Sequence, residues 1–154
     1  MEAIVAYFSA TGVTRDRALE IAKILNCDTL RIMPEVDYTP EDLNWIDKEC
    51  RSSREMHDDV ARPAILTKSV DLSKYDTVLL GFPIWWYTAP RIVNSFIEHN
   101  NLLGKKIYVF ATSGGSNALR AFQDLSNLYP SLEFIDHKIV TEYNAHEVVD
   151  WLNK

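Results

Sequence analysis

Residues 9–14, Ser-Ala-Thr-Gly-Val-Thr, have the composition of a phosphate-binding turn. They follow an apolar run and precede an amphipathic segment, a strand–turn–helix layout in which backbone N–H groups meet an anion. The three hydroxyls can donate hydrogen bonds, and Gly12 lets the backbone approach a ligand closely. Because the turn contains no lysine, we expect dipoles rather than a matched cation to hold the phosphate. The candidate contact residues are Ser9, Ala10, Thr11, Gly12, Val13 and Thr14.

A plain helix cap is the alternative interpretation of this turn, because serine and threonine are common just before helices. Other nucleotide-binding motifs are missing from the sequence. The chain has no Gly-Lys-Ser/Thr and no G-x-G-x-x-G. The first apolar run is not followed by an acidic cluster, which argues against a phospho-acceptor receiver domain.

A second segment, residues 81–90, places four aromatic residues within six positions and has a proline on either side of the tryptophan pair. Large apolar side chains on a loop are costly unless they cover something, and a flat ring system is their natural ligand. The prolines reduce the entropy lost on binding. Alternatively, one tryptophan packs in the core or in a dimer interface. The candidate contact residues are Pro83, Ile84, Trp85, Trp86 and Tyr87.

A third segment, residues 112–117, combines two glycines with small hydroxyl residues. Such a loop exposes backbone N–H and C=O groups, which can recognise the polar edge of a heterocycle. A tight turn with Ser116 or Asn117 as helix cap is the alternative, and both interpretations can hold together. The candidate contact residues are Thr112, Ser113, Gly114 and Gly115.

Apolar runs alternate with amphipathic segments along the chain, which predicts parallel strands joined by crossover helices in an α/β three-layer fold. The predicted strands are 3–8, 28–32, 77–81, 106–112 and 132–140. The predicted helices are 14–25, 91–100, 117–129 and 144–153. In an open parallel sheet, ligands bind where loops leave the carboxyl ends of the strands. We therefore expect the three candidate segments to meet at one edge of the sheet.

Residues 34–62 interrupt this alternation and carry nine acidic and four basic residues. Most of the formal net charge of −6 is therefore located in this segment, which we call the acidic excursion. One interpretation is a solvated excursion with a short helix around residues 41–56. The other is an acidic rim near a redox site.

The bulk properties predict a single domain, residues 1–154, in the cytoplasm. The negative charge argues against nonspecific nucleic-acid binding, and no apolar run is long enough to span a bilayer. The N-terminal apolar stretch lacks a preceding basic region, so we interpret it as a strand and not a signal peptide. Cys27 and Cys50 lack metal-ligand spacing and fit free thiols in a reducing compartment. The histidines also lack metal-like spacing, and we expect surface or structural roles for them; they are His57, His99, His137 and His146.

Phosphate at the first turn, a flat ring at the second and a polar ring edge at the third describe flavin mononucleotide (FMN). The chain resembles the flavodoxin family in residues 7–14, 81–86 and 111–116, the last two being similar to a bacterial subfamily with a Pro-x-Trp-Trp loop. This resemblance implies a five-stranded parallel sheet in the order 2-1-3-4-5 and noncovalently bound FMN. It also implies specific contacts at each loop. Ser9, Thr11, Gly12 and Thr14 would hold the phosphate, Pro83, Trp85, Trp86 and Tyr87 would border the isoalloxazine, and Thr112, Ser113, Gly114 and Gly115 would meet its pyrimidine edge.

The functional predictions are electron transfer or, alternatively, reduction of a quinone by NAD(P)H through FMN. The net charge favours an electron carrier that docks on basic partners. The second loop favours the reductase, because it is aromatic and has no acidic residue between Gly81 and Ile97. A redox-silent flavin-binding module is a third possibility. The expected partners are redox proteins or a small quinone-like acceptor, and the expected state is a monomer or a homodimer. We find no acid–base or nucleophilic constellation in the sequence, so no catalytic side chain is predicted.

Overall fold

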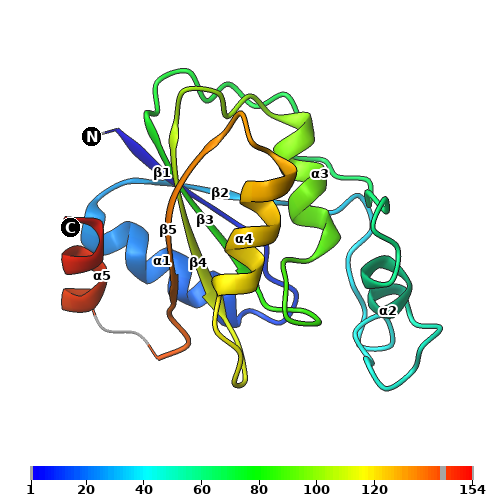
Figure 1. Cartoon of the computed structure of the whole chain (residues 1–154). Coiled ribbons are helices and arrows are strands. Elements are labelled where there is room, and N and C mark those ends of the chain that lie inside the picture. The colour runs from blue at the N-terminus through cyan, green and yellow to red at the C-terminus, as the bar shows by residue number, and fades with distance from the viewer. Residues whose placement is uncertain (1, 143–144, 154) are drawn as a thin grey trace.

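The computed structural model describes residues 2–142 and 145–153 and contains a five-stranded parallel sheet (Figure 1). Its strands are β1 (Ala3–Tyr7), β2 (Asp28–Arg31), β3 (Thr77–Pro83), β4 (Lys106–Thr112) and β5 (Glu133–Ile139). They lie in the order β2-β1-β3-β4-β5, and every pair of neighbours is parallel. This confirms the predicted fold class and strand order.

Helices cover both faces of the sheet, as the three-layer prediction requires (Figure 1). They are α1 (Val13–Leu25), α2 (Arg51–Met56), α3 (Arg91–His99), α4 (Leu119–Leu128) and α5 (Ala145–Leu152). Apolar residues of α1 and α5 form one buried cluster with the sheet, and those of α3 and α4 form a second. The short helix α2 belongs to the acidic excursion and lies beside the sheet rather than on either face (Figure 1). No helix in the described part of the chain is long and apolar enough to cross a membrane.

Most predicted boundaries agree with the structure to within two residues. The largest difference among the strands is at β3, which continues past Gly81 to Pro83 and is two residues longer than expected. Pro83 is tolerated there because it ends the strand, and the following N–H of Ile84 donates to the carbonyl of Thr112 at 2.9 Å. The predicted start of the last helix, Asn144, lies outside the described residues.

The helix predicted around residues 41–56 is too long, since only its last six residues are helical. Polar side chains hold the preceding residues in turns instead. Thr39 and Asp42 bond each other's backbone N–H, and Asp47 accepts from the N–H of Glu49 at 2.9 Å. Short Asp and Thr side chains compete with helix formation in this way.

The middle of the sheet depends on one close contact between β3 and β4. Gly81 is paired with Phe110, and a Cβ atom at Gly81 would lie 2.0 Å from the Phe110 ring. The Phe110 side chain is fully buried on the face covered by α1 and α5. Position 81 therefore requires glycine because of space, and its φ angle is not the reason.

We predict that Gly81→Ala lowers the free energy of unfolding by about 1–3 kcal/mol, because the added methyl group overpacks the Phe110 site. The matched control is Gly115→Ala, where an added Cβ meets no atom within 4 Å. Urea unfolding of the two variants should separate them. Equal stability would contradict the packing explanation.

Candidate functional site

The loops that follow β1, β3 and β4 meet at the carboxyl edge of the sheet, where two adjoining cavities lie. The larger has a volume of about 380 Å³ and is lined by Trp45, Ile84, Trp85, Trp86, Tyr87 and Ser116. The smaller has a volume of about 180 Å³ and is lined by Ala10, Thr11, Leu43, Trp45, Ser52, Pro83, Trp85 and Trp86. They share three tryptophans, so together they form one aromatic-walled cleft, called here the edge cleft. The larger cavity alone is within the range of about 300–1,000 Å³ typical of ligand sites.

The turn after β1 presents backbone N–H groups to this edge. Gly12 is the N-cap of α1 with a φ angle of 100°, a left-handed conformation that favours glycine. Its N–H donates to the Ser9 hydroxyl at 3.1 Å, so Ser9 does stabilise the turn itself. Among the described residues, the N–H groups of Thr11 and Val13 have no acceptor. Free amides at the start of a 13-residue helix suit an anion.

Thr14 is buried, and its hydroxyl points to the loop after β4. Its Oγ1 atom lies 2.8 Å from Oγ1 of Thr112, and either oxygen can be the donor. When Thr112 donates, the Thr14 proton remains available for another acceptor. The pair therefore fixes the first loop against the third loop, and it leaves one hydroxyl proton for a ligand.

A cation lies beside the turn after all, although none lies within it. The Arg15 guanidinium is placed so that a Cβ at Gly12 would be 3.1 Å from its Nη2 atom. Arg15 also pairs with Asp16 at 3.1 Å, but both side chains are more than half exposed. Such a pair is weak, so the guanidinium is free to turn to a nearby anion. The sequence analysis missed this residue because it searched for lysine inside the turn rather than for arginine after it.

The aromatic loop is a two-residue hairpin. Trp85 and Thr88 exchange backbone hydrogen bonds of 2.9 and 3.0 Å, and Trp86 and Tyr87 between them have φ angles of 47° and 68°. Two positive φ angles define a type I′ turn, which large side chains rarely adopt. The turn directs the two tryptophans differently. Trp85 packs edge-on against Phe8 at 5.6 Å between ring centroids, whereas Trp86 lies near His57.

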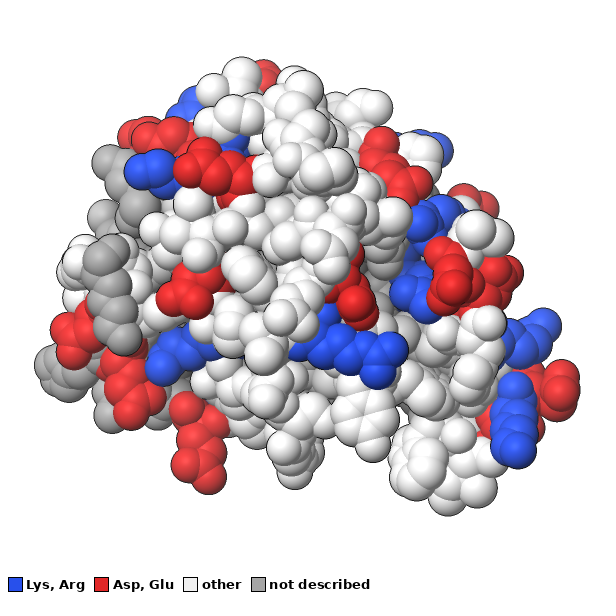
Figure 2. Space-filling model, viewed as in Figure 1, with Lys and Arg blue, Asp and Glu red and all other residues white. Residues whose placement is uncertain are grey.

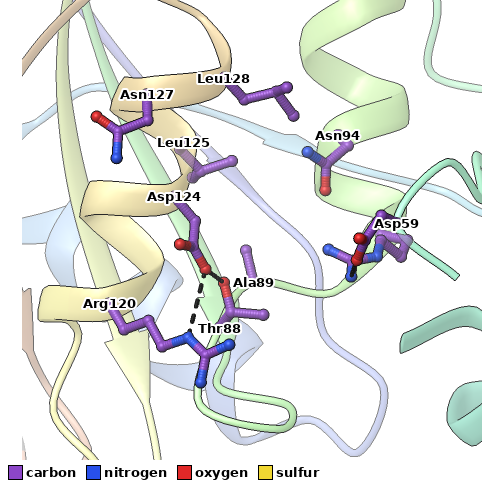
Figure 3. A pocket seen from close by; sticks show the side chains of 10 residues that line it. Asp59, Thr88, Ala89, Asn94, Arg120, Asp124, Leu125, Asn127 and Leu128 are labelled. Atoms are coloured by element: carbon purple, nitrogen blue, oxygen red, sulfur yellow. Dashed lines mark hydrogen bonds and ion pairs between the residues drawn. The ribbon is translucent and has the colours of Figure 1, made fainter. Parts of the chain in front are cut away.

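A separate cavity of about 460 Å³ lies between α3 and α4, behind this hairpin (Figure 3). It shares no lining residue with the edge cleft. The Thr88 hydroxyl donates to Asp124 of α4 at 2.6 Å, and Arg120 approaches the same carboxylate at 3.7 Å. These contacts, drawn in Figure 3, attach the base of the hairpin to α4. We assign the polar groups of this cavity to holding the aromatic wall.

The loop after β4 contributes less to the edge cleft than the sequence suggests. Thr112 is directed to Thr14, and the Ser113 hydroxyl accepts from the N–H groups of Gly115 and Ser116 at 3.1 and 2.7 Å. Gly114 and Gly115 lie at the exposed tip. Of this loop only Ser116 lines the larger cavity. The Ser113 bonds match the tight-turn interpretation.

The acidic excursion supplies a wall that the sequence analysis did not assign. Trp45 lines both cavities of the edge cleft, although its side chain is 70% exposed. Leu43 and Ser52 line the smaller one. The tryptophan within the apolar group Leu43, Trp45 and Ile46 of an acidic segment was the available signal, because such side chains are costly in solvent.

Tyr38 fixes this excursion to the site. Its ring lies 5.5 Å from Phe8 and 5.4 Å from Trp85, and the Arg51 guanidinium lies 3.7 Å from the ring centre. Its hydroxyl donates to Glu55 at 2.5 Å. Burial, and next the bond to the Glu55 carboxylate, raise the pKa of Tyr38 far above its ordinary value. The phenol therefore stays protonated and keeps donating at any physiological pH.

The fold and the edge cleft define a doubly wound α/β protein with a ligand site at the carboxyl edge of its sheet. Comparison with known families is more specific. The sequence model described as Flavodoxin matches residues 2–154, and the chain therefore belongs to the flavodoxin family.

Solved structures agree with this assignment. A Bacteroides uniformis protein assigned as a flavoprotein is 41% identical, with a TM-score of 0.95 over 99% of this chain and 98% of the other. A Bacteroides eggerthii counterpart is also 41% identical, with a TM-score of 0.96 over 99% and 96%. The flavoprotein of Lactobacillus acidophilus, solved in complex with FMN, shares the fold at 18% identity, with a TM-score of 0.74 over 99% of each chain. No curated protein matches the chain in sequence.

We predict that Thr14→Val lowers the free energy of unfolding of the flavin-free protein by about 1–3 kcal/mol, because it leaves the buried Thr112 hydroxyl without its partner. The double variant Thr14→Val/Thr112→Val should cost less than the sum of the two single changes, since both hydroxyls are then removed. Urea unfolding of the four proteins measures this coupling. Strictly additive single changes would show that the two hydroxyls do not interact.

Proposed function

We propose that this protein binds FMN noncovalently in the edge cleft and transfers electrons through it. The observation that carries the proposal is the continuity of the site: free amides of the turn after β1 lead directly to a cleft walled by three tryptophans. Membership of the flavodoxin family supports it. So do the FMN complexes of similarly folded proteins from Lactobacillus acidophilus and Treponema denticola.

We assign the phosphate to the turn at residues 9–14, with Ser9, Thr11, Gly12 and Thr14 as its contacts and Arg15 as an added cation. The isoalloxazine lies among Pro83, Trp85, Trp86 and Tyr87, as expected for the Pro-x-Trp-Trp subfamily. Residues 112–115 meet the pyrimidine edge, and Ser116 joins them. Trp45 covers the cleft from the excursion.

FMN supplies the redox chemistry when bound, and the chain supplies binding, orientation and exclusion of water. The apolar walls exclude water from the ring, and the hairpin from Trp85 to Thr88 limits how far those walls can move. The described lining residues of the edge cleft include no ionisable carboxylate. The ring is therefore surrounded by aromatic and backbone groups and has no adjacent acidic side chain.

The proposed partners are redox proteins or a small quinone-like acceptor, in the cytoplasm, with the protein acting as a monomer or a homodimer. The surface around the excursion does not form a purely acidic docking face. Where the excursion lies, basic and acidic side chains alternate instead of forming one acidic patch (Figure 2). The net charge alone favours a basic protein as the partner. The mixed distribution of charge is also compatible with a small-molecule partner.

A second candidate function is an FMN-dependent NAD(P)H:quinone-type reductase. The specific observation in its favour is the aromatic, acid-free wall of the edge cleft, which suits a flat substrate as well as a flat cofactor. A third candidate is a redox-silent flavin-binding module, which is a binding protein rather than an electron carrier or an enzyme.

We predict that the flavin-free protein binds FMN roughly 100-fold more tightly than riboflavin, because only FMN has a phosphate for the amides and hydroxyls of the turn. Arg15→Gln should weaken FMN binding by about threefold and reduce its salt dependence, since the exposed guanidinium contributes modestly. Lys23→Gln, at the far end of α1, is the matched control. Fluorescence titration of the flavins measures all four cases. Equal affinity for FMN and riboflavin would exclude the turn as the phosphate site.

The two candidate redox functions differ in the number of electrons that the flavin takes up in each step of reduction. An electron carrier should take up electrons from dithionite in two resolved one-electron steps and should not oxidise NAD(P)H rapidly. A reductase should oxidise NAD(P)H in the presence of a quinone and should be reduced in one two-electron step. Anaerobic titration with visible spectroscopy makes the measurement. An FMN-loaded protein that exchanges electrons in neither assay would support the redox-silent module instead.

A further inference from the structure

Another cavity, of about 700 Å³, lies on the outer side of the aromatic wall and is larger than either part of the edge cleft. The acidic excursion and the hairpin form it together. Its principal lining residues are Trp45, Ile46, Lys48, Arg54, His57 and Trp86. Because Trp45 and Trp86 also line the edge cleft, the two sites are separated by shared indole side chains.

Two of the three large apolar side chains that line this cavity are mostly exposed. Trp45 and Ile46 are adjacent in sequence and are 70% and 74% exposed. His57 contacts Trp86 edge-on, with 5.8 Å between ring centroids. Large apolar groups grouped at one cavity indicate a ligand with a hydrophobic ring rather than random exposure.

The charge of the cavity is opposite to that of the segment that forms it. Lys48 and Arg54 line it, against a single carboxylate, that of Glu49. Within residues 2–142 and 145–153, neither cation forms an ion pair or a side-chain hydrogen bond. Arg51 and Arg62, by contrast, are paired with Glu55 and Glu98 at 3.1 and 2.6 Å.

This difference separates two kinds of cation in the excursion. The paired arginines hold the excursion in place, while Lys48 and Arg54 are left available at the cavity. An anionic group seated beside the exposed ring surfaces would meet both of them. The cavity is therefore complementary to a molecule with a flat apolar part and a negative charge.

We propose that this cavity binds a planar aromatic anion of low molecular weight. Such a ligand lies against the same two indoles that border the edge cleft, so an electron acceptor bound there would exchange electrons with the flavin across these rings and would not take hydride from it by direct contact. The ligand's role as a redox partner of the flavin rests on the proposed function. The binding site itself is inferred from the lining residues alone.

The test uses FMN-loaded protein and three probes followed by isothermal titration calorimetry. Anthraquinone-2-sulfonate has both the ring and the charge, 2-(hydroxymethyl)anthraquinone has the ring alone, and methanesulfonate has the charge alone. We expect the sulfonated ring to bind roughly tenfold more tightly than the neutral ring, and methanesulfonate not to bind measurably. Flavin absorbance after ultrafiltration must show that FMN stays bound throughout.

The double variant Lys48→Gln/Arg54→Gln should abolish the preference for the sulfonated ring. The matched control Lys23→Gln/Lys68→Gln removes two exposed lysines that do not line the cavity and should preserve it. Trp45→Leu should weaken both ring-bearing probes by a similar factor.

Three outcomes would overturn the proposal: displacement of FMN by the probe, equal affinity for the neutral and sulfonated rings, or the same loss in the control variant as in the Lys48/Arg54 variant. Failure of the proposed function gives a different result, because the protein would then take up no FMN before any probe is added. In that case the same titration on the flavin-free protein still tests the cavity.

Discussion

The parallel arrangement of all five strands is the constraint on which the site depends. Because every strand runs in the same direction, the loops after β1, β3 and β4 leave the sheet at one edge, although they are separated by about 30 to 100 positions in the chain. The register of β3 and β4 is fixed in turn by Gly81, whose missing side chain leaves space for Phe110. A small shift at that pair would move the aromatic loop relative to the turn that we assign to phosphate.

Loop placement alone does not build the aromatic wall. The acidic excursion must also be brought to the edge, and Tyr38 does this by packing against both Phe8 of the sheet edge and Trp85 of the hairpin. The Arg51 guanidinium covers the Tyr38 ring, and Glu55 accepts a hydrogen bond from the Tyr38 hydroxyl. Tyr38 therefore connects three parts of the chain and holds the excursion at the site.

Sequence periodicity was sufficient for the sheet, because buried parallel strands are continuous apolar runs and their crossover helices are amphipathic. The three loops were also identifiable, since each combines residue types suited to one part of a ligand directly after a predicted strand: hydroxyls with glycine in the first and third, clustered aromatic rings in the second. Contacts made across the fold were not identifiable. The pairing of Thr14 with Thr112 depends on the register of β1, β3 and β4, and nothing local to either threonine indicates it.

The acidic excursion was also predictable from its sequence only in part. Its composition indicated solvent, and most of it is indeed exposed. The excursion is held at the site by tertiary contacts of Tyr38 instead, and no pattern in residues 34–62 displays them. The net charge of the excursion was likewise a poor guide to the charge at the outer cavity. A net charge counts ion-paired and unpaired side chains alike, whereas only the unpaired ones are available to a ligand.

The left-handed turn at Trp86 and Tyr87 has a consequence for how this family member can vary. Glycine at either position would relax the backbone, and selection for stability alone would favour that exchange. The same exchange would remove a ring from the wall and would let the hairpin sample more conformations. Two large residues in this backbone conformation therefore cost folding stability and give the wall a more fixed shape, so the rings at these positions are not explained by the needs of the fold.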